Sequence, residues 1–254
     1  MIHDAGLQRV QVNDEVPLTG EEGRHAVSSL RINVGEEVEL VDGHGLRVRG
    51  TVIIVSGKDT LRIQVTKIEV EGFAELRTTV VQALPKGEHG ELAVDLLTQV
   101  GVDVIVPWAA ARSLTRWAPD RIEKARNKWQ GALTAAAKQS RRARWPVLGE
   151  LATTTAVADL IAAGGTCIVL HEEAVASVLD VPIADLGGTS NLVLIVGPEG
   201  GISDEERDIF RAAGAIEACL GPGVLRSSAA GAVAVAVLSA ARNWGGPVMG
   251  GSRS

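Results

Sequence analysis

A run of small residues, Gly197-Pro198-Glu199-Gly200-Gly201, ends an apolar stretch in the C-terminal part of the chain. Glycine loses more backbone entropy on folding than any other residue, so three glycines in five positions are costly unless bare backbone is needed there. Ser203 and Glu206 follow at the spacing of a helix capping box. The pattern predicts a strand-to-helix loop whose backbone closely approaches a ligand, with a tight turn that binds nothing as the alternative.

Two further corners follow other apolar runs, at Leu170-His171-Glu172 and at Leu220-Gly221-Pro222-Gly223. From residue 75 on, apolar runs of strand length alternate with helix-like segments, which is typical of a parallel sheet covered by helices on both faces. Ligands of such sheets bind at the carboxyl ends of the strands. The three corners are therefore expected to surround one small molecule.

Two missing nucleotide-binding motifs and an acidic helix start limit the kinds of ligand that this site could bind. Neither G-x-G-x-x-G nor G-x-x-x-x-G-K-[ST] occurs, which disfavours a dinucleotide or a P-loop nucleotide. Asp204, Glu205 and Glu206 at the predicted helix start disfavour an anion there. The pattern favours a neutral or cationic ligand held by backbone groups, and spacing alone goes no further.

The elements that position these corners form two predicted domains. Residues 1–71 alternate with the period of strands around a hairpin signal at Asp42-Gly43-His44-Gly45, which predicts a small β-barrel. Residues 75–254 are predicted to form the parallel-sheet α/β domain. Its predicted strands lie near residues 76–84, 102–108, 166–172, 191–197 and 217–221, and its predicted helices near 89–100, 119–140, 203–214 and 226–242.

The composition predicts a soluble cytoplasmic protein with a local site for a polyanion. The chain has 254 residues, 46% of them hydrophobic, and a net charge of −6. Between Arg112 and Arg144, however, ten Lys and Arg residues face only two acidic ones, a pattern that fits a surface for a polyanion and equally fits a solvated helix face. Cys167 and Cys219 lie in apolar contexts and are expected to be reduced core residues. No signal peptide or membrane-spanning run is expected.

Five motifs occur in an order that resembles one known family. They are LPKG (84–87), QVGVDVIVP (99–107) with Arg112-Ser113, AAAKQSRR (135–142), LIVGPEGGIS (194–203) and LGPGVLR (220–226). The sequence resembles the bacterial small-subunit rRNA uridine N3-methyltransferases, the RsmE group of the SPOUT (α/β-knot) superfamily. GRHAVSSLRINVGEEVELVDG (23–43) is similar to the PUA-like barrel of that family, so the resemblance covers nearly the whole chain.

The resemblance implies a PUA-like β-barrel that binds RNA, followed by a parallel-sheet domain that threads a trefoil knot. It implies S-adenosyl-L-methionine as the methyl donor, no metal, and a homodimer. The expected product is N3-methyluridine at one specific uridine of 16S rRNA, made on the small ribosomal subunit. Two alternatives stay open: methylation of another RNA atom such as a ribose 2′-oxygen, and a non-catalytic RNA-binding or ribosome assembly factor.

Residue roles also follow from the resemblance. Arg226 is the predicted catalytic residue, which would stabilise the developing uridine anion or orient the base, and Arg112 is a second candidate. The predicted cofactor-binding residues are Leu170, His171, Gly197, Pro198, Glu199, Gly200, Gly201, Leu220, Gly221, Gly223, Val224 and Leu225. The predicted RNA-binding residues are Arg112, Arg116, Gln139, Arg141 and Arg142.

One position departs from the family pattern. Family members commonly have LRTETA after the last glycine loop, whereas this chain has Leu225-Arg226-Ser227-Ser228-Ala229-Ala230. Ser228 stands at the acidic position and cannot act as a carboxylate base. The sequence therefore assigns no general base.

Overall fold

The computed structural model describes residues 1–4, 6–72, 74, 76–182 and 190–241. The chain divides into two compact units. The first unit comprises residues 1–73 and 134–145, and the second comprises residues 74–133 and 146–254. Residues 134–145 thus group with the first unit, although the sequence pattern placed them in the second predicted domain.

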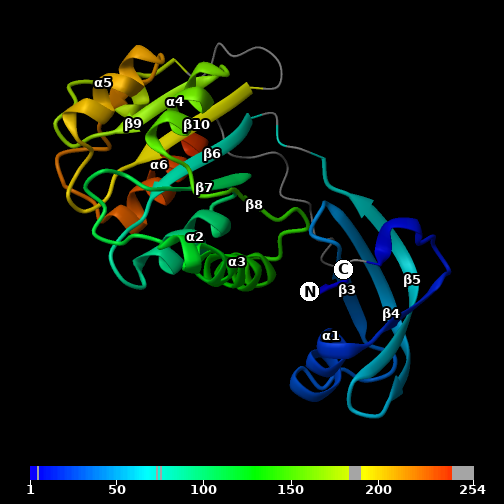
Figure 1. Ribbon diagram of the computed structural model, residues 1–254. Helices are drawn as coiled ribbons and strands as arrows, with labels where there is room; N and C mark the ends of the chain where they lie inside the picture. Colours follow the sequence, from blue (N-terminus) through cyan, green and yellow to red (C-terminus); the bar gives the residue numbers. More distant parts are fainter. Residues whose placement is uncertain (5, 73, 75, 183–189, 242–254) are drawn as a thin grey trace. The chain divides into compact units, whose positions relative to one another are not determined.

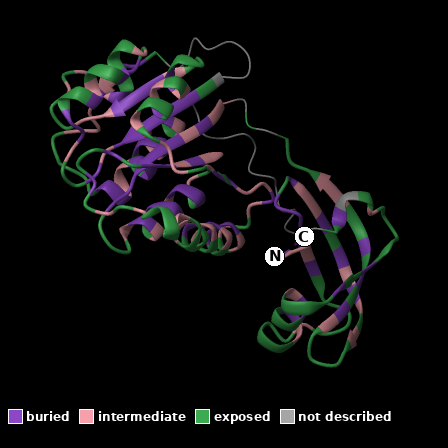
Figure 2. Cartoon of the chain, in the orientation of Figure 1, coloured by how far each residue is buried: buried purple, intermediate pink, exposed green. Residues whose placement is uncertain are grey.

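The first unit is built on a five-stranded sheet with the order β1-β3-β4-β5-β2 (Figure 1). Its strands are β1 (Ile2–His3), β2 (Glu15–Leu18), β3 (Glu37–Val41), β4 (Leu46–Ser56) and β5 (Thr60–Val70), and one short α-helix, α1 (Gly20–Arg24), follows β2. Purple, buried bands alternate with more exposed ones along these strands in Figure 2. The fully buried residues include Leu40, Val48 and Ile63. The strand periodicity predicted for this region is confirmed.

The predicted hairpin at residues 42–45 joins the antiparallel strands β3 and β4. The Asp42 carboxylate accepts hydrogen bonds from the backbone N–H groups of His44 at 2.7 Å and Leu46 at 3.0 Å. Gly43 and Gly45 have φ angles of 78° and 109°, which favour glycine over residues with a side chain. The turn is therefore fixed by local chemistry that can be read from the sequence.

Residues 134–145 group with the first unit because they form hydrogen bonds with the hairpin between β3 and β4. The backbone N–H of Gly45 donates to the carbonyl of Ala143 at 3.0 Å, and that of Trp145 donates to Gly43 at 2.9 Å. The Trp145 ring lies 4.3 Å from the His3 ring between centroids. These backbone bonds and ring contacts explain why the unit boundary differs from the predicted one.

The second unit contains a six-stranded sheet with the order β11-β9-β10-β6-β7-β8, and its described strand pairs are all parallel (Figure 1). Its strands are β6 (Leu76–Ala83), β7 (Val104–Trp108), β8 (Val147–Leu148), β9 (Thr166–Leu170), β10 (Ser190–Val196) and β11 (Ile216–Ala218). Its helices are α2 (His89–Gln99), α4 (Thr154–Ala162), α5 (Asp204–Ala212) and α6 (Ser227–Ala241). Helix α3 (Ile122–Gln139) is divided, with residues 122–133 in this unit and residues 134–139 in the first. The predicted end of the last helix at residue 242 lies outside the described residues.

Among the strands and α-helices of this unit, the two-residue strand β8 and helix α4 were not predicted. The segment that forms α4 has only nine residues, TTAVADLIA, so its helical period is hard to recognise. Its start is nevertheless marked by Thr153, whose hydroxyl oxygen accepts a hydrogen bond from the N–H of Ala156 at 3.2 Å. Threonine is one of the residues preferred at a helix N-cap.

Helices cover both faces of the parallel sheet, as predicted. On one face, Val81, Cys167 and Ile195 share a core with Phe210 of α5, and burial raises the pKa of the Cys167 thiol to about 12, so the thiol is protonated. On the other face, α6 packs so closely that a Cβ atom on Gly231 would lie 3.2 Å from Val196. A parallel sheet buried on both faces explains why its strands are apolar without alternation.

Within the described ranges, no helix is long and apolar enough to cross a membrane. The same residues contain no group of three or more His, Cys, Asp or Glu side chains placed to hold a metal ion.

Candidate active site

The structure brings the three corners to one edge of the second unit's sheet. β9 lies between β10 and β11, and Leu170, the last residue of β9, is in register with both Val196 and Ala218 at the ends of its neighbours. The segments that follow the three strands therefore meet at the same carboxyl edge (Figure 1).

These segments enclose a first hollow of about 80 Å³. It is lined by most of the predicted cofactor residues, namely Leu170, His171, Gly197, Pro198, Gly201, Leu220, Gly221, Gly223, Val224 and Leu225. Four lining residues were not predicted: Glu172, Val196, Ile202 and Ala230. Glu172 belongs to the same corner as Leu170 and His171, so its position directly after the strand was an available signal.

Three glycines of this lining leave room at the first hollow. An added Cβ on Gly221 or Gly223 would meet no protein atom within 4 Å, so a side chain there would project into open space. Gly201 has a φ of 72°, a left-handed conformation that residues with side chains rarely adopt. Bare backbone at these positions fits a ligand that approaches the loops closely.

Gly197 and Gly200 are constrained by protein neighbours instead. A Cβ on Gly197 would lie 2.7 Å from Cγ1 of Ile202, and a Cβ on Gly200 would lie 3.1 Å from the carbonyl oxygen of Arg112. Gly200 lines neither this hollow nor the adjacent one. The immediate reason for a glycine at position 200 is thus close packing against the Arg112 backbone.

A second hollow of about 240 Å³ adjoins the first. The two share Glu172, Gly197, Pro198, Gly201, Val224 and Leu225, and the second adds Glu199, Arg226 and Ser227. The Glu199 carboxylate accepts from the backbone N–H of Lys86, at 3.2 and 3.3 Å to its two oxygens. This contact links the 197–201 loop to the 84–87 segment. Arg226 is the cationic side chain among the residues that line the second hollow.

Ser227 connects the two loops that form the second hollow. Its hydroxyl donates to the carbonyl oxygen of Gly197 at 2.6 Å and accepts from the Nε2 of Gln82 at 3.0 Å. Gln82 is fully buried at the end of β6. This chain of hydrogen bonds fixes the start of α6, and with it Arg226, relative to the 197–201 loop.

Removal of the Ser227 hydroxyl is therefore expected to loosen the site. Ser227→Ala leaves the Gly197 carbonyl and the Gln82 amide without this partner, which should lower the free energy of unfolding by about 1–2 kcal/mol. We expect weaker cofactor binding in calorimetry as well, because the loops are no longer tied together. Ser227→Thr keeps the hydroxyl and is the matched control. Equal cofactor affinities for the alanine and threonine variants would contradict the role of this bond.

Glu206 holds the segment that carries Arg112. One carboxylate oxygen accepts from the N–H of Ala111 at 2.8 Å and from the hydroxyl of Thr154 at 2.9 Å, and the other accepts from the N–H of Ser203 at 3.2 Å. Glu206 is 4% exposed. The predicted capping box is present, and its glutamate also orders a loop 95 residues earlier in the chain.

The predicted RNA-binding residues fall into both units. Arg112 and Arg116 are exposed in the second unit, after β7. Gln139, Arg141 and Arg142 belong to the first unit, where Gln139 and Arg141 are exposed and Arg142 is half-buried. The structure therefore does not gather these five residues within a single unit.

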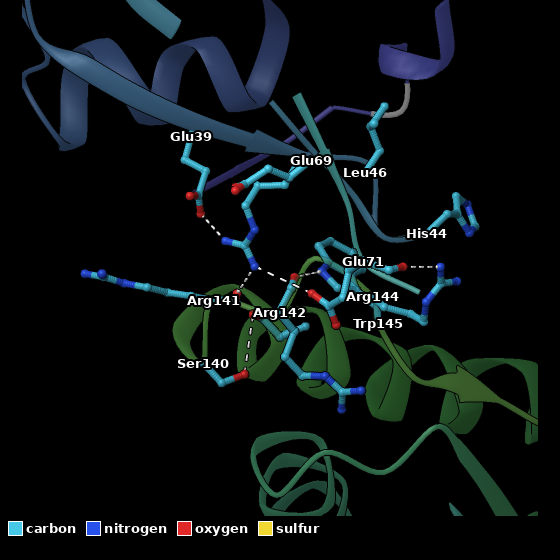
Figure 3. Close-up of polar contacts among 12 residues, drawn as sticks. Glu39, His44, Leu46, Glu69, Glu71, Ser140, Arg141, Arg142, Arg144 and Trp145 are labelled. Carbon is cyan, nitrogen blue, oxygen red and sulfur yellow. Dashed lines mark hydrogen bonds and ion pairs between the residues drawn. The ribbon is translucent and has the colours of Figure 1, made fainter. Parts of the chain in front are cut away.

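The backbone around Arg141 is clamped while its side chain extends outward. Arg141 has a φ of 56°, and its carbonyl accepts from the guanidinium of Arg47 at 3.1 Å. The carbonyl of Arg142 accepts from Nε1 of Trp145 at 3.1 Å. Figure 3 shows the Arg141 side chain pointing away from the other labelled side chains. An arginine on a fixed backbone with an exposed head group is suited to contact phosphate.

Comparison of the sequence with known protein families identifies the class of this protein. Residues 74–239 match the RNA methyltransferase domain family, and residues 18–66 match the RNA methyltransferase PUA domain family. The chain is an RNA methyltransferase with an N-terminal PUA domain.

Individual relatives narrow the class. Ribosomal RNA small subunit methyltransferase E of Mycobacterium bovis is 42% identical over 220 residues, which cover 85% of this chain and 82% of that protein. The protein of the same name from Bacillus subtilis is 25% identical over 237 residues, or 91% and 92% of the two chains. This chain belongs to the family of ribosomal RNA small subunit methyltransferase E.

A solved structure shares the fold along nearly the whole chain. A putative methyltransferase from Legionella pneumophila, in complex with the bound cofactor SAM, aligns with a TM-score of 0.80 and 27% identity, covering 94% of this chain and 96% of that one. The predicted family and the predicted fold class, a parallel-sheet α/β domain preceded by a PUA-like domain, are confirmed. The trefoil threading stays a prediction.

Proposed function

We propose that this protein transfers a methyl group from S-adenosylmethionine to N3 of a uridine in the rRNA of the small ribosomal subunit. The observation that carries the proposal is the pair of adjoining hollows at the carboxyl edge of the sheet, with Arg226 in the second. Family membership supports the rRNA of the small subunit as substrate. The solved relative that contains bound SAM supports the methyl donor.

The lining of the first hollow suits S-adenosylmethionine. Leu170, Leu220 and Leu225 offer apolar surface to the adenine ring, and the open backbone at Gly221 and Gly223 can hydrogen-bond its edge. Bound there, S-adenosylmethionine supplies a methyl group that is already activated, so the chain mainly positions the acceptor and stabilises charge.

Arg226 supports the choice of uridine N3 as acceptor. Loss of the imide proton leaves negative charge on the base, and a guanidinium in the second hollow can stabilise that charge as it develops. The exposed cations Arg112, Arg116 and Arg141, together with the half-buried Arg142 and with Gln139, are proposed to hold the RNA through its phosphates. The homodimer implied by the resemblance stays a prediction that light scattering can check.

The test uses small ribosomal subunits from a strain that lacks the corresponding activity. The subunits are incubated with the protein and S-adenosylmethionine, and the rRNA is digested and analysed by nucleoside mass spectrometry against chemical standards. We expect new N3-methyluridine, absent when the cofactor is left out.

Other outcomes separate the alternatives. A 2′-O-methylated nucleoside would show that the acceptor is a ribose oxygen and not N3, while the protein would still be an RNA methyltransferase. No methylated nucleoside, together with no calorimetric heat at millimolar S-adenosylmethionine, would favour the non-catalytic assembly factor.

A further inference from the structure

The second hollow is lined by two carboxylates, and a carboxylate is one kind of group that can accept the imide proton in N3 methylation. Its charged lining residues are Glu172, Glu199 and Arg226. Because the two hollows share six lining residues, a methyl donor in the first would reach an acceptor in the second without crossing protein. A base for the imide proton must therefore lie on the wall of the second hollow.

The position that is acidic in relatives does not supply this base. Ser228 lies in the first turn of α6, is 3% exposed and lines neither hollow. A hydroxyl at that position neither ionises near neutral pH nor faces the acceptor.

The two carboxylates of the hollow differ in their contacts. Both oxygens of Glu199 accept from the backbone N–H of Lys86, so Glu199 is held in place as a link between loops. The Glu172 side chain is exposed and makes no hydrogen bond or ion pair within the part of the chain that the structure describes. Glu172 lines both hollows, so it lies where donor and acceptor would meet.

The charged and titratable groups around Glu172 come from the three loops of the site. His171 and Glu173 flank it on its own loop, Glu199 lies on the 197–201 loop, and Arg226 precedes α6. Nδ1 of His171 accepts from the backbone N–H of Glu173 at 3.2 Å, so that nitrogen is already engaged. Glu172 is thus the side chain best placed to receive a proton.

We infer that Glu172 is the proton acceptor for the imide N–H of the substrate uridine, an inference that rests on the proposed function. The N3–H bond breaks and its proton passes to the Glu172 carboxylate. The electron pair left on N3 forms the new N–CH₃ bond, while the methyl–sulfur bond breaks and its electron pair stays on sulfur. Glu172, being exposed, then returns the proton to solvent, and Arg226 balances the charge on the uracil oxygens in between.

Two isosteric variants test the assignment. Glu172→Gln removes the base, and Glu173→Gln removes the same charge from the neighbouring residue, whose side chain lines neither hollow. In single-turnover assays on small subunits, we expect Glu172→Gln to lower the rate of N3-methyluridine formation about 100-fold and Glu173→Gln to change it less than about 3-fold. Calorimetry with S-adenosylmethionine should give affinities within about 3-fold of wild type for both variants.

The pH profile distinguishes a base from a residue that merely shapes the site. The Glu172→Gln rate should rise about tenfold per pH unit, because only solvent base then removes the proton, whereas the wild-type rate should depend less steeply on pH. Parallel pH profiles, or a loss of cofactor affinity that accounts for the whole rate loss, would overturn the inference. If wild-type protein makes no N3-methyluridine, the proposed function itself fails; if both variants match wild type, only this inference fails.

Discussion

Arg226→Ala is expected to lower the rate constant of methyl transfer roughly 100- to 1000-fold, the usual cost of removing one donor that stabilises a developing anion. Arg226 lines the second hollow but not the first, so its loss should leave the affinity for S-adenosylmethionine within about 3-fold of wild type. The backbone should be undisturbed, because the Arg226 carbonyl still accepts from the N–H groups of Ala229 and Ala230. The measurement combines single-turnover methylation of small subunits with calorimetric cofactor binding.

Two controls sharpen this result. Arg211→Ala removes an exposed arginine from α5 that pairs with Asp208 and Glu217, away from both hollows, and should leave turnover unchanged. Arg226→Lys keeps the charge but loses the planar fork, so an intermediate rate is expected. An equal loss of turnover and of cofactor affinity in Arg226→Ala would reassign Arg226 to cofactor binding.

Phe210→Ala is expected to cost about 3–5 kcal/mol of unfolding free energy in the second unit. Phe210 is fully buried on α5, and its ring lies 5.3 Å from the ring of Trp108 in an edge-to-face arrangement. The truncation leaves a cavity under the helix that begins just after the 197–201 loop, so the loop should lose order together with the core. Urea unfolding followed by tryptophan fluorescence measures the effect.

Phe210→Leu is the matched control, since it keeps most of the volume and should cost clearly less than the alanine variant. A loss below about 1 kcal/mol for Phe210→Ala would mean that the core collapses around the gap and that α5 is held mainly by its polar contacts. Those contacts include the ion pair between Arg207 and Glu217 at 2.8 Å, which also holds the pKa of the Glu217 carboxyl below its ordinary value.

Local patterns in the sequence predicted the elements well, because they depend on neighbours within a few residues. The strand at 191–197, the capping box of Ser203 and Glu206 and the hairpin at 42–45 all occur as predicted. The alternation of strands and helices also determined the parallel sheet, and with it the expectation that three corners meet at one edge. Helix α4 was not predicted, because its nine residues are too few for a helical period to be recognised in the sequence.

Contacts between distant segments could not be predicted, since no local period encodes them. The Glu206 carboxylate reaches back 95 residues to Ala111, and Gln82 meets Ser227 across 145 residues. The grouping of residues 134–145 with the first unit depends on bonds such as that between Arg47 and the Arg141 carbonyl, 94 residues apart. Such pairings are fixed by packing of whole elements.

The sequence by itself determined the class of this protein, the parallel sheet of its second domain and the corners that form its site. The tertiary structure alone decided which side chains face one another there. It placed Glu172 in both hollows, buried Ser228 away from them and engaged Glu199 with Lys86. The reason is physical: spacing along the chain shows that residues follow a strand end, whereas burial and hydrogen-bond partners in the folded protein decide which carboxylate is available to take a proton.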